Sequence, residues 1–172
     1  FTYRQSFFWA LTPSQDAIIS PNFMSNRGQG VDVEYRYAMN STTPGVINRG
    51  QWLMSFIQDT QVNQSRGLLS GLHRQQVNPD LTINAQAFLP TDPNYLSDLS
   101  NSGVQRALPS GDSSLYVSRR LDVGNVYLLG QYLQPLQAGG KDTFQRLPEI
   151  GTNFVNIAPF DGPVLLGLES GL

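Results

Sequence analysis

Few side chains in this sequence could carry out covalent chemistry. His73 is the only histidine, and the chain contains no cysteine. A Ser-His-Asp arrangement would therefore have to use His73, and no nucleophile motif such as GxSxG accompanies it. We interpret His73 as a turn residue or as a residue of a wet interior, and we predict no catalytic residue.

The sequence offers equally few residues that could bind a metal or a phosphate. Carboxylates are the remaining candidate metal ligands, and they show no EF-hand spacing. No carboxylate pair stands out for glycoside chemistry, although the sequence leaves that possibility open. The Arg27–Gly30 segment contains only GxG and follows no βαβ pattern, which argues against a phosphate loop. We predict that the protein is not an enzyme and uses neither a metal nor a cofactor.

The composition narrows the class of partner. Charged residues make up only 14% of the chain, against roughly 25% in ordinary globular domains. A net charge of −2 argues against a nucleic-acid partner, because no excess of cations could neutralise phosphates. The longest run without charge, residues 123–140, is interrupted by amides and a proline, so a membrane-spanning helix is not expected.

The elements that must position any site are predicted to be long β-strands. Val31, Val33, Tyr35 and Tyr37 alternate with charged residues, so one face of that strand is apolar and the other is charged. Similar segments recur between turns rich in Gly, Pro, Asn, Asp or Ser. The predicted strands are residues 3–12, 16–25, 30–40, 47–60, 66–75, 80–89, 112–121, 125–135, 143–157 and 162–172.

Strand length distinguishes a membrane protein from a soluble one. A tilted spanning strand needs about 9–11 residues, whereas soluble strands average roughly five or six. The fold class is therefore all-β, an antiparallel meander of about ten long strands that forms part of a large outer-membrane β-barrel. Two segments fit less well. Residues 47–58 are apolar on both faces, and residues 90–111 form a connection too long for a tight turn.

Pro21 lies inside an otherwise good strand. A proline there removes a ladder donor, so it belongs at a bulge, at a sheet edge, or where pairing must be weak. An ordinary bulge is the simplest of these readings.

Several motifs, in this order and spacing, resemble the lipopolysaccharide-assembly outer-membrane protein family LptD (organic solvent tolerance protein). The opening FFWALTPSQDAIISPNFMSNRGQGVDVEYRY is similar to its first three barrel strands, and TDPNYLSDLSN to a later "D-x-x-Y-x-x-D" stretch. The matching positions are Phe7, Phe8, Trp9, Pro13, Asp16, Pro21, Arg27, Gly28, Glu34, Tyr35, Arg36, Tyr37, Asp92, Tyr95 and Asp98.

The resemblance implies that residues 1–172 are the first part of the family barrel, without its periplasmic N-terminal domain and closing strands. It implies transport of lipopolysaccharide (LPS) to the outer leaflet through a lateral gate beside the first strand. The implied partners are LPS itself, an LptE-like plug lipoprotein and an LptA-like periplasmic bridge protein. Family members can carry a proline just before the aromatic pair, and here that position is Ser6.

The gate and the lumen each have candidate residues. The gate candidates are Ser6, Phe7, Phe8, Trp9 and Pro21, and the lumen-facing candidates are Asp32, Glu34 and Arg36. Two other functions remain open from the residues alone: another outer-membrane channel such as a porin, and a soluble β-sandwich that binds carbohydrate.

Overall fold

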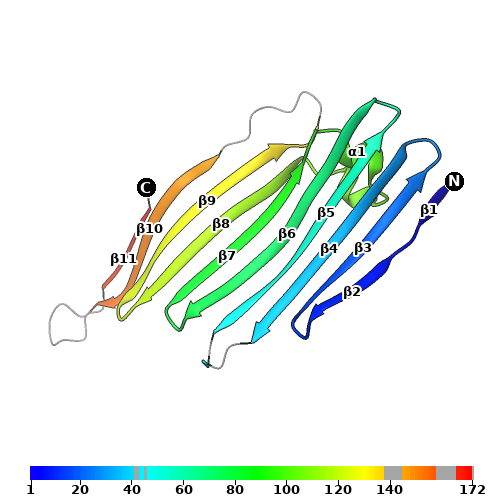
Figure 1. The fold of residues 1–172 in the computed structure, drawn as a ribbon. Helices are drawn as coiled ribbons and strands as arrows, with labels where there is room; N and C mark the ends of the chain where they lie inside the picture. The colour runs from blue at the N-terminus through cyan, green and yellow to red at the C-terminus, as the bar shows by residue number, and fades with distance from the viewer. Residues whose placement is uncertain (41–42, 45, 138–144, 158–165, 172) are drawn as a thin grey trace.

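The structure is a computed structural model, and it describes residues 1–40, 43–44, 46–137, 145–157 and 166–171. Its strands form one antiparallel sheet in which β3 to β11 lie side by side in chain order and both β1 and β2 pair with β3, as Figure 1 shows. The elements are β1 Thr2–Arg4, β2 Phe7–Thr12, β3 Gln15–Met24, β4 Gly28–Asn40, β5 Ile47–Asp59, β6 Gln64–Asn78, β7 Leu81–Pro90, α1 Tyr95–Leu99, α2 Gly103–Arg106, β8 Ser110–Leu121, β9 Gly124–Pro135, β10 Arg146–Ile157 and β11 Leu166–Gly171.

The all-β, antiparallel meander predicted from the alternation is confirmed. Each predicted strand overlaps an observed one, and the turns fall where Gly, Pro, Asn, Asp and Ser gather. Gly28 has a φ of +106° at the start of β4, a conformation that residues with a Cβ rarely adopt. The predicted strand residues 143–144, 162–165 and 172 lie outside the described residues.

One prediction about the elements is wrong. The first predicted strand is divided into β1 and β2, both of which pair with β3. The long connection after β7, which is too long for a tight turn, contains the short helices α1 and α2. No helix in the described part of the chain is long and apolar enough to cross a membrane.

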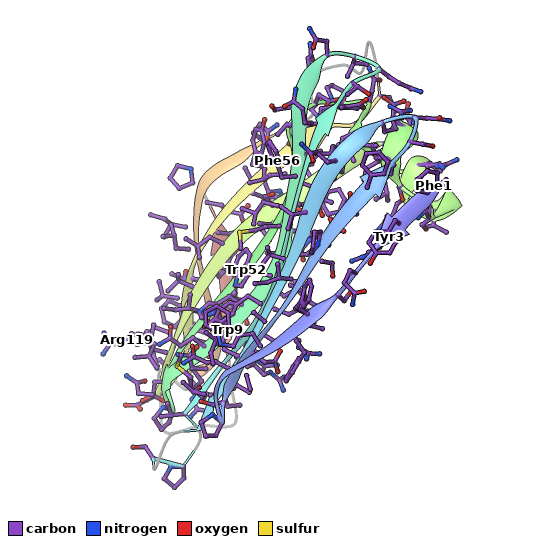
Figure 2. The ribbon with its side chains drawn as sticks, turned by 45° about the vertical axis from the view of Figure 1, so that its right-hand side comes forward. Phe1, Tyr3, Trp9, Trp52, Phe56 and Arg119 are labelled. Carbon is purple, nitrogen blue, oxygen red and sulfur yellow. The ribbon has the colours of Figure 1, made fainter. Side chains whose placement is uncertain are left out.

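The sheet has an apolar face that is largely open. It carries large side chains that point to the same side, among them Trp9, Trp52 and Phe56, which Figure 2 labels. The pairing register assigns these apolar side chains to that face: Phe7, Trp9, Ile19, Val31, Val33, Tyr35, Tyr37, Trp52, Met54, Phe56, Leu69, Leu115, Leu128, Tyr132 and Ile150. Phe56 is 50% exposed and Ile150 is 56% exposed. Sheet faces that stay in water are normally polar.

The opposite face, here called the polar face, carries most of the charged and amide side chains and also α1. One end of it is apolar where α1 packs. Tyr95 and Leu96 of α1 form a buried cluster with Leu136, and Leu68 and Phe88 from the sheet pack against that cluster. This arrangement explains why Phe88 interrupts a polar series in β7.

The same packing resolves the ambiguous strand over residues 47–58. Its two faces are both apolar because Leu53 and Ile57 lie on the polar face and line the cavity beneath α1. Trp52, Met54 and Phe56 alternate with them on the apolar face. The register of this strand therefore needs no revision.

Candidate functional site

The first strand of the sheet is interrupted opposite Pro21. β1 pairs with β3 through Arg4 and Asn22, and β2 pairs with the same strand through Phe7 and Ile19. The two pairings keep a single register, so Gln5 lies opposite Pro21. Ladder pairing is lost only at Gln5 and the following residue, and it resumes at once.

The missing donor of Pro21 accounts for this interruption. The N–H of Gln5 donates to the carbonyl oxygen of Pro21 at 3.2 Å, but Pro21 has no N–H to return to Gln5. In an antiparallel strand the N–H and C=O of one residue point to the same neighbour. The deficit therefore falls entirely on the first strand, and none of it falls on β4.

The pairing of β3 with β4 supports this assignment. Pro21 lies opposite Val31 in a ladder that runs from Gln15 to Met24 without a register shift. A bulge at Pro21 would have shifted that register, so the bulge interpretation is wrong. Pro21 sits next to an edge strand, where a lost donor weakens only the pairing with that edge.

A side-chain contact bridges the same point. The hydroxyls of Ser6 and Ser20 lie 2.8 Å apart, and Ser20 is only 1% exposed. Because Gln5 and Pro21 occupy a hydrogen-bonded position, Ser6 and Ser20 form the adjacent non-hydrogen-bonded pair, where opposing side chains come closest. Within the described residues, this contact is the only side-chain hydrogen bond between residues 5–12 and β3.

The remaining gate candidates lie along β2. Phe7 and Trp9 lie on the apolar face and are each 56% exposed, whereas Phe8 lies on the polar face and is 65% exposed. All six residues of β2 are exposed, because in the described structure β2 pairs only with β3. The structure thus places Ser6, Phe7, Phe8, Trp9 and Pro21 at one edge of the sheet, where one backbone hydrogen bond is missing.

The three lumen candidates of β4 lie together on the polar face. Asp32 accepts a hydrogen bond from Asn22 and forms an ion pair with Arg4 at 3.2 Å. Arg36 donates to the carboxylate of Asp16 at 2.7 Å, so this arginine of β4 neutralises a charge on β3. Glu34 accepts from Gln51 of β5.

A buried ionic cluster holds α1 against this face. Arg66 is 3% exposed, and its guanidinium donates to Asp59, Asp92 and Asp98 at distances between 2.8 and 3.0 Å. Arg27 adds a second cation on Asp59 at 2.9 Å. Since Asp92 precedes α1 and Asp98 lies within it, one arginine ties that helix and its N-terminal approach to β5 and β6.

Tyr95 completes the attachment of α1. Its ring lies 5.8 Å from the guanidinium carbon of Arg66, within the range of a cation–π contact. The Asp92, Tyr95 and Asp98 positions of the "D-x-x-Y-x-x-D" stretch thus converge on one residue. The spacing of three between these positions is a signal that can be read from the sequence, but no pattern marks Arg66 or Asp59 as their partners.

The strength with which the ionic cluster holds α1 should depend on pH. The hydrogen bonds from Arg66 lower the pKa of Asp92 below its ordinary value, against the opposing effect of burial. A carboxyl with a lowered folded-state pKa stabilises the fold fully above its unfolded pKa of about 3.9 and loses that contribution as pH falls through the folded value.

We therefore expect the α1 segment to keep its hydrogen-exchange protection from neutral pH to about pH 4 and to lose it below that. Mass spectrometry of peptides spanning residues 91–100, with the exchange rates corrected for intrinsic pH effects, measures the change. Protection that stays constant down to about pH 2 would show that the carboxylates do not hold α1.

His73 does not lie in a turn or on the polar face, so both of those interpretations are wrong. It lies within β6 on the apolar face, and its Nδ1 is hydrogen-bonded to the Tyr37 hydroxyl. Gly50 of β5 separates the two residues, and a Cβ there would overlap Tyr37. In the described residues, no cluster of three or more potential metal ligands is present.

A family model and several related proteins agree on the family that this chain resembles. The family model described as LptD, LPS transport system D, matches residues 64–170. A protein of Idiomarina loihiensis named LPS-assembly protein LptD is 28% identical over 94% of this chain and 21% of its own length. Proteins of the same name from Aromatoleum aromaticum and Paracidovorax citrulli are 31% and 29% identical, over 86% and 94% of this chain and 18% and 21% of theirs. The chain spans about a fifth of the length of these relatives.

Proposed function

This chain belongs to the LptD family, and on that premise we propose that it forms part of the wall of an outer-membrane barrel that passes LPS to the outer leaflet. The apolar face contacts lipid and the polar face lines a hydrated lumen. Residues 1–172 contribute the first strands of that barrel, and strands elsewhere in the full-length protein pair with the free edges, because unpaired edges are too costly in lipid.

The broken first strand is the observation that carries the proposal. LPS is a bulky amphiphile, and its acyl chains cannot leave a barrel whose ladder is closed, since each broken backbone bond in lipid costs several kcal/mol. Pro21 removes one of these bonds in advance. The first strand can then bend away from β3 at Gln5 and Ser6, which opens the seam on its other side.

The two alternatives fit the structure less well. A porin needs a closed and stable wall, so it gains nothing from a weakened edge next to Pro21. A soluble carbohydrate-binding sandwich would bury one face of the sheet against a second layer. Trp9 and Phe56 remain about half exposed in the described structure, which favours contact with lipid over contact with water.

The proposal involves transport without bond making. LPS is handed over by an LptA-like bridge protein, and an LptE-like plug lipoprotein occupies the lumen, where Asp32, Glu34 and Arg36 offer polar contacts. These partners rest on the family relationship. Neither nucleic acid nor a catalytic residue has a part in this function, and the matching family model describes a transport system.

A depletion experiment tests the function. Cells depleted of the full-length protein should lose LPS from their surface and accumulate it on the periplasmic side, and expression of the full-length protein should reverse both effects. Accessibility of LPS to an enzyme added outside the cells measures export, and the level of an unrelated outer-membrane porin serves as the control. Ion conductance by the purified protein together with normal surface LPS after depletion would favour a porin instead.

A further inference from the structure

A second polar-face site lies at the end of the sheet away from α1. It is a cavity of about 520 Å³ lined by residues of β4 to β8. Arg49 and Arg74 both line it, and they are directly opposite one another in the register of β5 and β6. Two cations in directly opposed positions repel each other and destabilise a sheet.

Neither arginine has a neutralising partner among the described residues. The other ion pairs of the polar face are already formed: Asp16 and Glu34 face Arg36, and Asp32 faces Arg4. Asp112 accepts a hydrogen bond from Gln131. Arg49 and Arg74 therefore leave two adjacent positive charges uncompensated at the cavity wall, both on exposed side chains.

The rest of the lining is suited to a sugar. Amide and hydroxyl groups of Gln51, Asn84, Gln86 and Ser114 surround the arginines and offer both donors and acceptors. Leu72 is 60% exposed in this part of the polar face, and with the ring of Tyr116 it supplies the apolar surface that the C–H face of a pyranose requires. Guanidinium groups bind phosphate and carboxylate oxygens through paired hydrogen bonds.

We propose that Arg49 and Arg74 form a binding site for an anionic oligosaccharide, and that an acidic group of the glycan, phosphate or sugar-acid carboxylate, lies between the two guanidinium groups. The inference rests on the proposed function and deepens it, because it assigns the glycan of LPS a defined contact on the polar face. The free energy gained on neutralising both cations favours an acidic sugar over a neutral one.

Binding of delipidated LPS oligosaccharide to the purified full-length protein in detergent tests the site. The Arg49→Gln/Arg74→Gln variant should bind about tenfold or more weakly than the unaltered protein, because charge-assisted contacts are lost. The matched control is Arg119→Gln/Arg120→Gln, which removes the same charge at the end of β8, outside the cavity lining, and should bind as the unaltered protein does.

The chemistry of the glycan identifies the group that is bound. Dephosphorylated oligosaccharide should bind weakly if phosphate is recognised, and oligosaccharide with reduced carboxyl groups should bind weakly if the sugar acid is recognised. Equal binding by the arginine variant and the unaltered protein, or an equal loss in the control variant, would overturn the proposal. If either of these binding results is obtained and depletion still removes LPS from the surface, the arginine site is refuted while the transport function stands. Failure of the site is therefore distinguishable from failure of the proposed function.

Discussion

Replacing Arg66 by methionine should release α1 from the polar face. The substitution removes the common partner of three carboxylates, one of which, Asp59, has no exposed surface. Breaking a buried ion pair by removing one partner costs about 3–5 kcal/mol. Arg27 still faces Asp59 at 2.9 Å, so we expect about 3 kcal/mol, the lower end of that range.

Hydrogen exchange of the full-length protein in detergent measures this loss. A change of about 3 kcal/mol corresponds to roughly 100-fold faster exchange in residues 91–100, whereas the strands should keep their protection. Arg66→Lys should give an intermediate rate, because lysine retains the charge but cannot present the planar fork that contacts Asp92 twice. The Arg66→Lys variant also keeps the test decisive if the methionine variant does not assemble.

Arg120→Met is the matched control. Its ion pair with Asp80 is exposed, with side chains 69% and 57% accessible, and such pairs contribute little in water. Exchange in residues 91–100 should therefore be unchanged in this variant. Unchanged exchange in Arg66→Met would contradict the assignment of Arg66 as the residue that holds α1.

The strand positions could be predicted from the sequence because two local signals agree. Alternation of the kind seen at Val31, Val33 and Tyr35 defines a strand face, and turn residues such as Gly28 mark its ends. Both signals act over a few residues, so no tertiary information is needed. The same locality explains why residues 47–58 were ambiguous, since the cover that α1 provides lies some forty residues further along the chain.

The buried ionic cluster around Arg66 could not be predicted from the sequence, because its members come from distant parts of the chain. Arg27 lies in the turn before β4, Asp59 and Arg66 lie in β5 and β6, and Asp92 and Asp98 lie before and within α1, so only the folded sheet brings them together. Five charged residues at these positions are compatible with many exposed arrangements. Only the paired structure shows that two of them are buried and that the others enclose them.

The sequence shows that Pro21 is unusual for a strand, but the structural effect of this proline can be read only from the sheet. A proline removes one donor wherever it occurs, and the side of the strand that loses the bond depends on the register. Here the loss faces the first strand, at Gln5, and not Val31 of β4. The role of Ser20 had no local signal, because an isolated serine in a strand is common.

We expect the first strand to move relative to β3 while LPS leaves. Pro21→Ala restores the missing N–H with little added bulk, so it should add about one hydrogen bond, 0.5–1.5 kcal/mol, between Gln5 and residue 21. Export should slow by up to about tenfold if that bond breaks in the slow step. Export should be slowed but not abolished, because the substitution only strengthens the pairing of the first strand with β3.

A disulfide at the same point should have a much larger effect. Ser6 and Ser20 already place their hydroxyls 2.8 Å apart, and opposed positions in neighbouring strands suit disulfide geometry. Ser6→Cys/Ser20→Cys therefore offers a covalent lock that a reductant removes. The chain contains no cysteine of its own, and either single cysteine variant controls for the loss of one hydroxyl.

The control lock joins two strands far from the first one. Ala85 and Leu115 are directly opposite in β7 and β8, so Ala85→Cys/Leu115→Cys places an equivalent bond where no movement is required. Export should be normal in this variant under both redox conditions.

Surface LPS export by cells that carry only the Ser6→Cys/Ser20→Cys full-length protein, followed before and after reduction, is the most direct test of the proposed movement. We expect the oxidised protein to assemble but not to export LPS, and reduction to restore export to the level of the single cysteine variants. Export at the normal rate with the disulfide fully formed would contradict the proposed movement, because the first strand would then have no need to leave β3.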